Sequence, residues 1–389
     1  MDIIKIQSLL RDSQLDGWLF SDYHGHDFIS RQFLQLGDRF CTRRMFYYIP
    51  ARGEPVKVLS AIEPLLLDHL PGRKLLYRGI RGQKDTLAQI LTPGARIACQ
   101  YSPGGNVPTV CSMDGGLLEY LRTFGVELVS SADLMQHFGA VLTDAQIDSH
   151  RRAGEIVHRI LGDTFKYIRA CVDAGEYLDE YMLLQKMQQL IAAEPIHMDG
   201  PPFFGVDDHA CDPGYEPEEQ GSYPIREGSR LIIDFAARLK GEDTVYYDIS
   251  WCMNVGTAID PEYKRLFDTV NDARCMVLGM IQSHLDADKP IRGCDVDRAV
   301  QEFFAVRGLS EYLMHRTGHN IGHRCHGVGA NLDDFETHDV RTLLPGTMFS
   351  VEPGVYTEKY GVRLEYDVHI TPDKKLRIYG PIQNEILVI

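Results

Sequence analysis

The sequence has little positive charge and no long apolar run. Lysine and arginine total 40 against 55 aspartate and glutamate residues, which gives a formal net charge of −15. General nucleic-acid binders and proteins that dock on anionic membranes rely on basic residues, so this balance argues against both classes. A membrane-spanning helix needs about 20 mostly apolar residues, and no stretch of about 18 occurs, so we expect no membrane span.

Paired cysteine motifs are also missing. The nine cysteines are scattered from Cys41 to Cys325 without a Cys-x-x-Cys pair. An odd and scattered set is typical of reduced thiols in a cytoplasm rather than of a disulfide framework. Residues 1–16 form an amphipathic helical pattern with acids, unlike a basic and apolar secretory signal. The sequence therefore predicts a cytoplasmic protein.

The 389 residues are long enough for at least two domains. Residues 1–140 alternate between helical and strand patterns, which indicates an α/β domain. Residues 141–389 begin with two long helical patterns and continue mainly as strands around two further helices, so we expect a larger α+β domain with its boundary near Val141. The four helices are expected at Asp144–Ala170, Tyr177–Ile191, Pro261–Leu285 and Asp295–Val306.

Four carboxylates in the second half stand where a strand pattern favours apolar residues. A buried, isolated carboxylate is costly unless a cation or a metal pairs with it. One such residue is compatible with a satisfied core acid, but four of them call for a shared explanation. They are Asp234, Asp248, Glu352 and Glu365.

A histidine cluster accompanies these carboxylates, with four histidines in residues 315–326 and glycines among and just after them. Neutral imidazole together with carboxylate suits divalent manganese, cobalt, zinc or iron. Ligation of a soft metal is not expected, because Cys325 stands alone. The sequence contains no His-Glu-x-x-His, P-loop, Gly-x-Ser-x-Gly or dinucleotide-binding motif.

The ordered set of these residues resembles the pita-bread metallohydrolases, which include prolidase, aminopeptidase P, methionine aminopeptidase and the metal-free creatinase. The resemblance is carried by IID, YYDIS, HRTGHNIGHRCH, VEPGVY and GVRLE. It is motif-specific in residues 230–389 and only architectural in residues 1–140. It implies a C-terminal pita-bread domain behind a smaller α/β domain of the creatinase type, and it implies a hydrolase.

Carried over residue by residue, the resemblance implies two divalent metal ions. Manganese, cobalt and zinc are the candidates, with manganese favoured. Asp234 would bind one ion, His319 and Glu352 the other, and Asp248 and Glu365 would bridge them. A bridging hydroxide would attack the scissile bond, and Glu352 would also transfer protons.

The same resemblance implies a set of residues that face the substrate. His326 and His315 would hold the scissile carbonyl and stabilise the oxyanion. Arg363 would help to fix the site and meet the substrate carboxylate. No role follows for His323 from the resemblance.

Two departures from the pattern bear on the substrate. Gly214 stands where prolidase-like members carry a substrate-contacting histidine, and nearby His209 is a candidate to replace it. Trp251 stands where a basic residue is usual, and we expect it to add apolar surface near the site.

Three functions remain open. The first is a prolidase-like peptidase that cleaves Xaa-Pro dipeptides or the N-terminal Xaa-Pro bond of short peptides. The second is a hydrolase of C–N bonds in small compounds, as in creatinase and ectoine hydrolase, which Gly214 and Trp251 favour slightly. The third is a non-catalytic binding module, against which the complete ligand set counts. A homodimer, a small peptide as the binding partner and no nucleic-acid partner are expected.

Overall fold

The computed structural model describes residues 1–389, which divide into two compact units. Unit 1 comprises Met1–Phe138 and unit 2 comprises Gly139–Ile389. The boundary that the sequence predicts near Val141 lies close to this division. None of the helices has the combination of length and apolar character that a membrane span requires.

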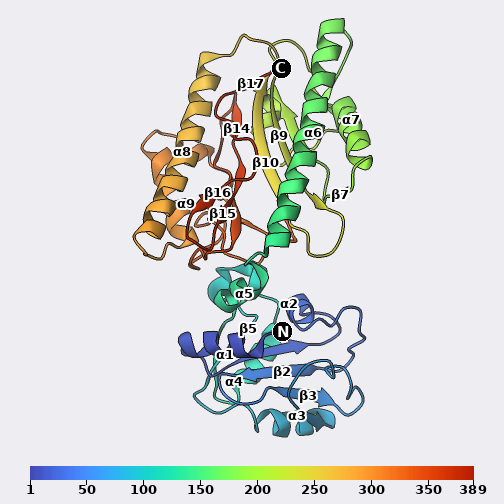
Figure 1. The fold of residues 1–389 in the computed structure, drawn as a ribbon, viewed down its shortest axis with the longest axis vertical. Helices are drawn as coiled ribbons and strands as arrows, with labels where there is room; N and C mark the ends of the chain where they lie inside the picture. The colour runs from blue at the N-terminus through green and yellow to red at the C-terminus, as the bar shows by residue number, and fades with distance from the viewer. The chain divides into compact units, whose positions relative to one another are not determined.

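Unit 1 is built on a six-stranded mixed sheet in the order β4-β3-β2-β1-β5-β6 (Figure 1). The central strand β1 pairs antiparallel with β2 and parallel with β5. Its side chains alternate between two apolar clusters, with Trp18 and Phe20 in one and Leu19 in the other, so both faces of the sheet are covered. The elements are α1 (Ile3–Asp12), β1 (Gly17–Asp22), α2 (Phe28–Phe33), β2 (Met45–Pro50), β3 (Val56–Ser60), β4 (Arg73–Tyr77), α3 (Gly79–Leu87), β5 (Arg96–Cys99), α4 (Gly115–Arg122), β6 (Glu127–Ser130) and α5 (Ala132–Gly139).

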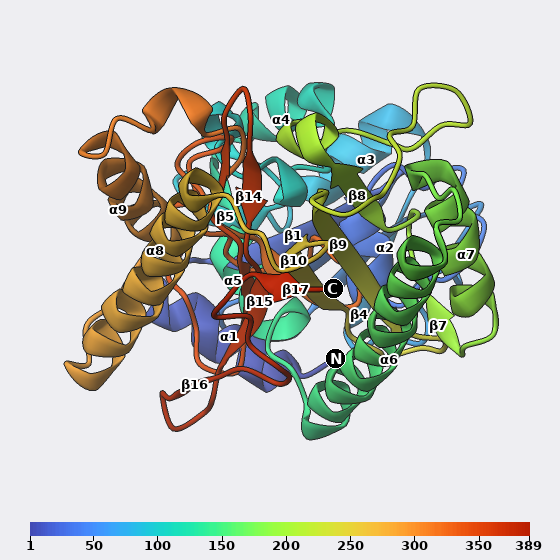
Figure 2. The same ribbon diagram turned by 90° about the horizontal axis from the view of Figure 1, so that it is seen from above.

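Unit 2 has three sheets: one with β17-β10-β9-β7 and with β8 on β9, one in the order β11-β12-β15-β16, and the hairpin β13-β14. Figures 1 and 2 show α6 and α7 on one side of these strands and α8 and α9 on the other. The elements are α6 (Asp144–Ala174), α7 (Glu180–Ala192), β7 (Ile196–His197), β8 (Phe203–Val206), β9 (Arg230–Leu239), β10 (Tyr247–Asn254), α8 (Pro261–Asp286), α9 (Gly293–Ala305), β11 (Asn320–Ile321), β12 (Met348–Val351), β13 (Gly354–Tyr356), β14 (Gly361–Arg363), β15 (Tyr366–Ile370), β16 (Leu376–Arg377) and β17 (Leu387–Val388).

The four long helices of unit 2 confirm the sequence patterns that predict them. Helix α6 begins where expected because Thr143 and Gln146 form a reciprocal capping box. It continues past Ala170 to Ala174, and Gly175 ends it in the left-handed conformation with φ of 66°. The packed faces of α6 and α7 cover β9 and β10 through one apolar cluster, while α8 and α9 cover β12 to β15 through another.

Successive side chains of strand β10 point to opposite faces of the sheet, so its polar and apolar residues lie on different sides. Asp248 and Ser250 face the carboxylate side, whereas Ile249 and Trp251 pack with the cluster under α6. The ring of Trp251 lies 5.2 Å from that of His158 on α6. The expectation that Trp251 adds apolar surface near the site is therefore wrong, because an odd-numbered position on this strand points away from Asp248.

Candidate metal centre

Four carboxylates and one histidine that the sequence singles out line a single cavity of about 340 Å³ in unit 2. Their elements are distant in sequence, but the antiparallel register of β9 and β10 places Ser250 opposite Asp234. The turns that follow β12 and β14 deliver the two glutamates. The positions are Asp234 on β9, Asp248 on β10, His319 directly before β11, Glu352 directly after β12 and Glu365 between β14 and β15.

The ligand atoms of these residues approach one another closely. His319 Nε2 lies 3.2 Å from Glu352 Oε1 and 3.6 Å from Asp248 Oδ2. Asp248, His319 and Glu365 are buried and offer one ligand atom each within 4.8 Å of one another. Such convergence of oxygen and imidazole nitrogen donors is the arrangement that a divalent cation requires.

Serine hydroxyls hold the ligands in place. Ser250 Oγ lies 2.6 Å from Asp234 Oδ2 and 2.9 Å from Glu365 Oε2. Ser350 Oγ accepts a hydrogen bond from the backbone N–H of His319 at 2.9 Å and donates one to Glu352 Oε1 at 3.0 Å. These bonds fix the orientation of the ligands before any cation binds.

Arg363 is buried beneath the carboxylates, and each of its three guanidinium nitrogens has a partner. Nη2 donates to Asp234 Oδ2 at 2.7 Å, Nε to Ser250 Oγ at 2.9 Å and Nη1 to the hydroxyl of Tyr356 at 3.0 Å. The arginine therefore fixes Asp234 in the structure. Three of its five N–H groups are in use, and the side chain also lines the cavity, so the contact with a substrate carboxylate that the resemblance implies stays a prediction.

Burial gives these groups unusual proton affinities. Burial, reinforced by Asp234, raises the pKa of Asp248 to about 7. Burial also raises the pKa of Glu352 to about 8, with Arg363 opposing and Asp248 adding to the shift. Burial, and after it the charge of Asp248, raises the pKa of Glu365 well above its usual value. Carboxylates crowded in this way hold protons unless cations replace them.

The residues present fit divalent metal ions. Asp248 Oδ1 and Glu365 Oε1 are buried and have no hydrogen-bond partner, which is costly for an oxygen unless a cation meets it. Burial and the neighbouring His326 lower the pKa of His319 well below its usual value, so its imidazole is neutral and able to donate a lone pair.

The metal-free protein should lose stability as the pH rises. Asp248 has a pKa of about 7 in the fold against 3.8 for an ordinary aspartate, and Glu352 has about 8 against 4.5. Between about pH 4 and pH 8 the folded chain therefore binds more protons than the unfolded chain, and the free energy of unfolding falls by on the order of a few kcal/mol. Thermal unfolding in chelator from about pH 5 to pH 8 measures this loss.

The Asp248→Asn/Glu352→Gln double variant is the control for that series, because it removes two of the three candidate ligand acids with raised pKa values and charges that act on the third, Glu365. Its unfolding temperature should change much less over the same pH range. A chelated wild-type protein that is equally stable or more stable at the higher pH would contradict the assignment.

The two histidines expected to face the substrate differ in their surroundings. His315 Nδ1 lies 2.7 Å from the carbonyl oxygen of Arg316, and its Nε2 lies 2.8 Å from the hydroxyl of Tyr356. The carbonyl oxygen only accepts, so Nδ1 is the protonated nitrogen. Burial lowers the pKa of His315 to about 4, so the ring is neutral, Nε2 accepts from the hydroxyl of Tyr356, and both nitrogens have partners. His326 lines the cavity with its ring 4.1 Å from that of His319, and it is the imidazole better placed to meet a substrate.

His209 is not among the residues that line the cavity. Its Nδ1 lies 2.8 Å from Glu180 Oε2, and its ring stacks against Tyr215 and Tyr223 with centroids 4.1 and 3.7 Å away. Glu180 is fully buried and also accepts hydrogen bonds from the hydroxyl of Tyr215 and the backbone N–H of Tyr223. The structure thus gives His209 a part in holding this loop and does not bring it to the metal ligands.

Packing does not explain the glycine at position 214. Its φ is not positive, and an added Cβ would meet only an oxygen of Asp212, at 3.4 Å. A larger side chain would therefore fit at Gly214. Its neighbour Pro213 lines the cavity.

Several residues that support the site were not predicted from the sequence. Asp367 Oδ2 accepts a hydrogen bond from the backbone N–H of Asp248 at 2.7 Å. Ser250 contacts Asp234 and Glu365, and Tyr356 holds His315 and Arg363. One signal was available, because Ser250 and Asp367 each follow a predicted ligand by two positions. In a strand, that spacing puts both side chains on the same face.

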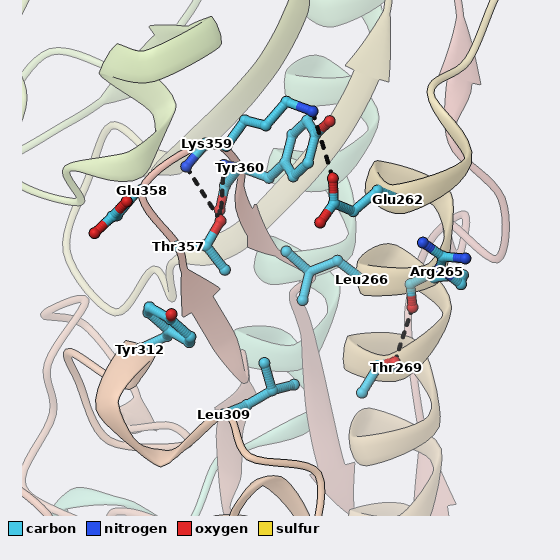
Figure 3. Close-up of a pocket in the computed structure, with 10 residues that line it drawn as sticks. All are labelled: Glu262, Arg265, Leu266, Thr269, Leu309, Tyr312, Thr357, Glu358, Lys359 and Tyr360. Carbon is cyan, nitrogen blue, oxygen red and sulfur yellow. Dashed lines mark hydrogen bonds and ion pairs between the residues drawn. The ribbon is translucent and has the colours of Figure 1, made fainter.

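A second cavity, of about 420 Å³, lies between α8 and the turn that connects β13 to β14 (Figure 3). It is larger than the first, but no histidine or cysteine lines it. Its acids Glu262 and Glu358 are exposed, and Glu262 Oε2 pairs with Lys359 Nζ at 3.4 Å. The chemistry of the lining residues, rather than the volume, makes the first cavity the candidate metal centre.

A model of metallopeptidase family M24 matches residues 148–372, which is more than half of the chain and contains all five ligands. The chain belongs to metallopeptidase family M24. The expectation of a hydrolase from the pita-bread class, with a fold of mixed α and β structure, is confirmed. Members of this family of metallopeptidases use divalent metal ions to cleave peptides, and the chain is a peptidase of this kind.

The relatives have low sequence identity to this chain, but they match it over most of its length. The probable dipeptidase PepE of Mycobacterium tuberculosis is 24% identical over 356 residues, which cover 88% of this chain and 84% of that protein. The fold is similar to the crystal structure of the dipeptidase PepE from Mycobacterium ulcerans, with a TM-score of 0.70 and 20% sequence identity. The match covers 100% of this chain and 96% of that chain. The prolidase from Thermococcus sibiricus covers both chains completely at 20% identity, with a TM-score of 0.62. At these identities the solved structures establish the fold.

Proposed function

We propose that this protein is a dinuclear-metal dipeptidase of the prolidase type, acting on Xaa-Pro dipeptides or on the N-terminal Xaa-Pro bond of short peptides. One observation carries the proposal: Asp234, Asp248, His319, Glu352 and Glu365 line one cavity. Four carboxylates and one imidazole around one cavity would hold two divalent ions better than one, because a single ion does not need four negative charges. The names of the dipeptidase and prolidase relatives support a dipeptide as the substrate.

In this proposal, two bound divalent ions would polarise the scissile carbonyl and lower the pKa of water to near neutrality. The protein's own groups do the rest. Glu352 lines the cavity beside His319, and once bound cations had displaced its own proton it would take a proton from water and pass it to the leaving amine. His326 is positioned to donate to the developing oxyanion, and His315 is held by Tyr356 at the wall of the cavity.

Arg363 and the serines would act as positioning residues. Because Arg363 holds Asp234 and Ser250 bridges Asp234 and Glu365, the ligands stay in register while the substrate changes shape. The choice of metal, with manganese favoured over cobalt and zinc, a homodimeric assembly and a cytoplasmic location remain predictions from the sequence.

The alternative is cleavage of a C–N bond in a small non-peptide compound. The orientation of Trp251 removes one of its two supports, since the indole packs under α6 and away from the cavity. The other support is Gly214, which leaves room beside Pro213 where a side chain would otherwise contact the substrate. A substrate other than Xaa-Pro would exploit that space.

A dipeptide panel tests the proposal. Purified protein is stripped with chelator, reloaded separately with Mn²⁺, Co²⁺ or Zn²⁺, and assayed on Xaa-Pro dipeptides, on matched Xaa-Ala dipeptides and on Xaa-Pro tripeptides. We expect hydrolysis of Xaa-Pro dipeptides with at least one metal, at kcat/KM well above that for the Xaa-Ala series. Cleavage of Xaa-Ala alone would reject the proline preference. The absence of any peptide hydrolysis with all three metals would favour the non-peptide alternative.

A further inference from the structure

Cys325 lies inside the metal centre, although the sequence presents it as an isolated thiol. Its Sγ is 3.0 Å from Asp248 Oδ2 and donates a hydrogen bond to it. The same carboxylate oxygen is 3.6 Å from His319 Nε2. Cys325 also lines the cavity that holds the five ligands. The thiol is therefore next to the position that a cation shared by Asp248 and His319 would take.

A second group of ligand atoms is centred on this thiol. His319, Cys325 and His326 offer one ligand atom each within 4.8 Å of one another, and they share His319 with the group formed with Asp248 and Glu365. The rings of His319 and His326 meet edge to face with centroids 4.1 Å apart. His319 is itself buried, with an Nδ1 that has no hydrogen-bond partner.

This second group differs in chemistry from the carboxylates. One thiolate and two imidazoles are ligands that zinc and cobalt prefer, whereas manganese prefers oxygen. A short connection explains why the group forms: His319 precedes β11, and residues 322–327 turn back so that Gly327 N–H bonds to Asn320 carbonyl oxygen at 2.8 Å. The turn brings Cys325 and His326 over the ring of His319.

We propose that Cys325 is a sulfur ligand of the metal ion on the His319 side of the centre, and that it biases this position toward zinc or cobalt over manganese. As the metal–sulfur bond forms, the S–H bond breaks and its proton passes to solvent, so the sulfur binds as thiolate. The hydrogen bond from Sγ to Asp248 is lost in the same step, which frees Asp248 Oδ2 for the metal. The inference rests on the proposed metal centre and adds a ligand to it.

The test uses the full-length protein loaded with Co²⁺, whose thiolate complexes absorb in the near ultraviolet by sulfur-to-metal charge transfer. Wild-type protein should show this band, and Cys325→Ser and Cys325→Val should lack it while metal analysis still finds bound cobalt. Competition between Zn²⁺ and Mn²⁺ should show the preference for zinc reduced by about tenfold or more in both variants. The serine variant keeps a hydrogen-bond donor to Asp248 and the valine variant does not. The same loss of the band and of the zinc preference in both variants therefore assigns the effect to sulfur ligation.

Cys275→Ser is the matched control. Cys275 is an exposed thiol on α8 in the same unit, outside the lining of the cavity, and its loss should leave the band and the metal preference unchanged. Wild-type protein that binds cobalt without the band, or a band that persists in both Cys325 variants, would overturn the inference while leaving the metal centre in place. Failure to bind cobalt at all would overturn both.

Discussion

Replacing Glu352 by glutamine should lower kcat/KM for the best dipeptide by about 10³-fold or more, within the range of general acid–base effects. Glu352 combines two functions in the proposed mechanism, since it is both a ligand and the group that transfers protons. It lies beside His319, with 3.2 Å between Oε1 and Nε2, and its side chain is only 12% exposed. Glutamine keeps the shape but cannot carry the proton and is a weaker ligand.

The control for this variant is Glu358→Gln in the turn between β13 and β14, close to Glu352 in sequence. Glu358 is exposed and lines the cavity of Figure 3 rather than the metal centre. Its replacement should leave kcat and KM unchanged. Full turnover by metal-loaded Glu352→Gln, with metal content verified, would contradict the proposed role. Circular dichroism and the unfolding temperature of the variant separate loss of chemistry from loss of fold.

Removing the metal should abolish hydrolysis and destabilise the protein. A ligand at about 100 to 1,000 times its dissociation constant stabilises the native state by about 3 to 4 kcal/mol, which corresponds to a shift in unfolding temperature of roughly 5 to 15 °C for a unit of this size. The physical reason is that Asp248, Glu352 and Glu365 are crowded in a buried site, where cations offset both desolvation and mutual repulsion. Differential scanning calorimetry of chelated and reloaded protein measures the shift.

Asp248→Ala provides the comparison for metal removal, because it deletes a carboxylate that is proposed to bridge the two ions, together with the cost of burying it. This variant should lose activity, and adding metal should raise its unfolding temperature much less than it raises that of the wild type. An equal response to metal in both proteins would place the stabilising cation elsewhere in the chain.

Local patterns predicted a large part of this structure. The long helices of unit 2 follow from their apolar periodicity and from caps such as Thr143 and Gly175. The four carboxylates were singled out because each interrupts an apolar run, where an unpaired charge is costly to bury. His319 was singled out by its place in the histidine cluster, and the resemblance to the pita-bread metallohydrolases assigned the ligand roles. The structure places all five around one cavity.

Other features depend on tertiary contacts that no local pattern contains. The side of β10 that faces the cavity is set by its register with β9, so Trp251 was placed on the wrong face. His209 is close in sequence to the glycine that it was expected to replace, but the buried Glu180 holds it away from the ligands. The position of Cys325 beside Asp248 is a contact between residues 77 positions apart, and the pattern of residues 322–327 alone does not contain it.

A crystal structure of protein loaded with Mn²⁺ or Zn²⁺, with anomalous difference maps at the metal edge, tests the central claim most directly. The account predicts two peaks about 3.5–4 Å apart, bridged by Asp248 and Glu365, with Asp234 on one side and His319 with Glu352 on the other. A single peak at full metal occupancy, or peaks that these five residues do not contact, would contradict it.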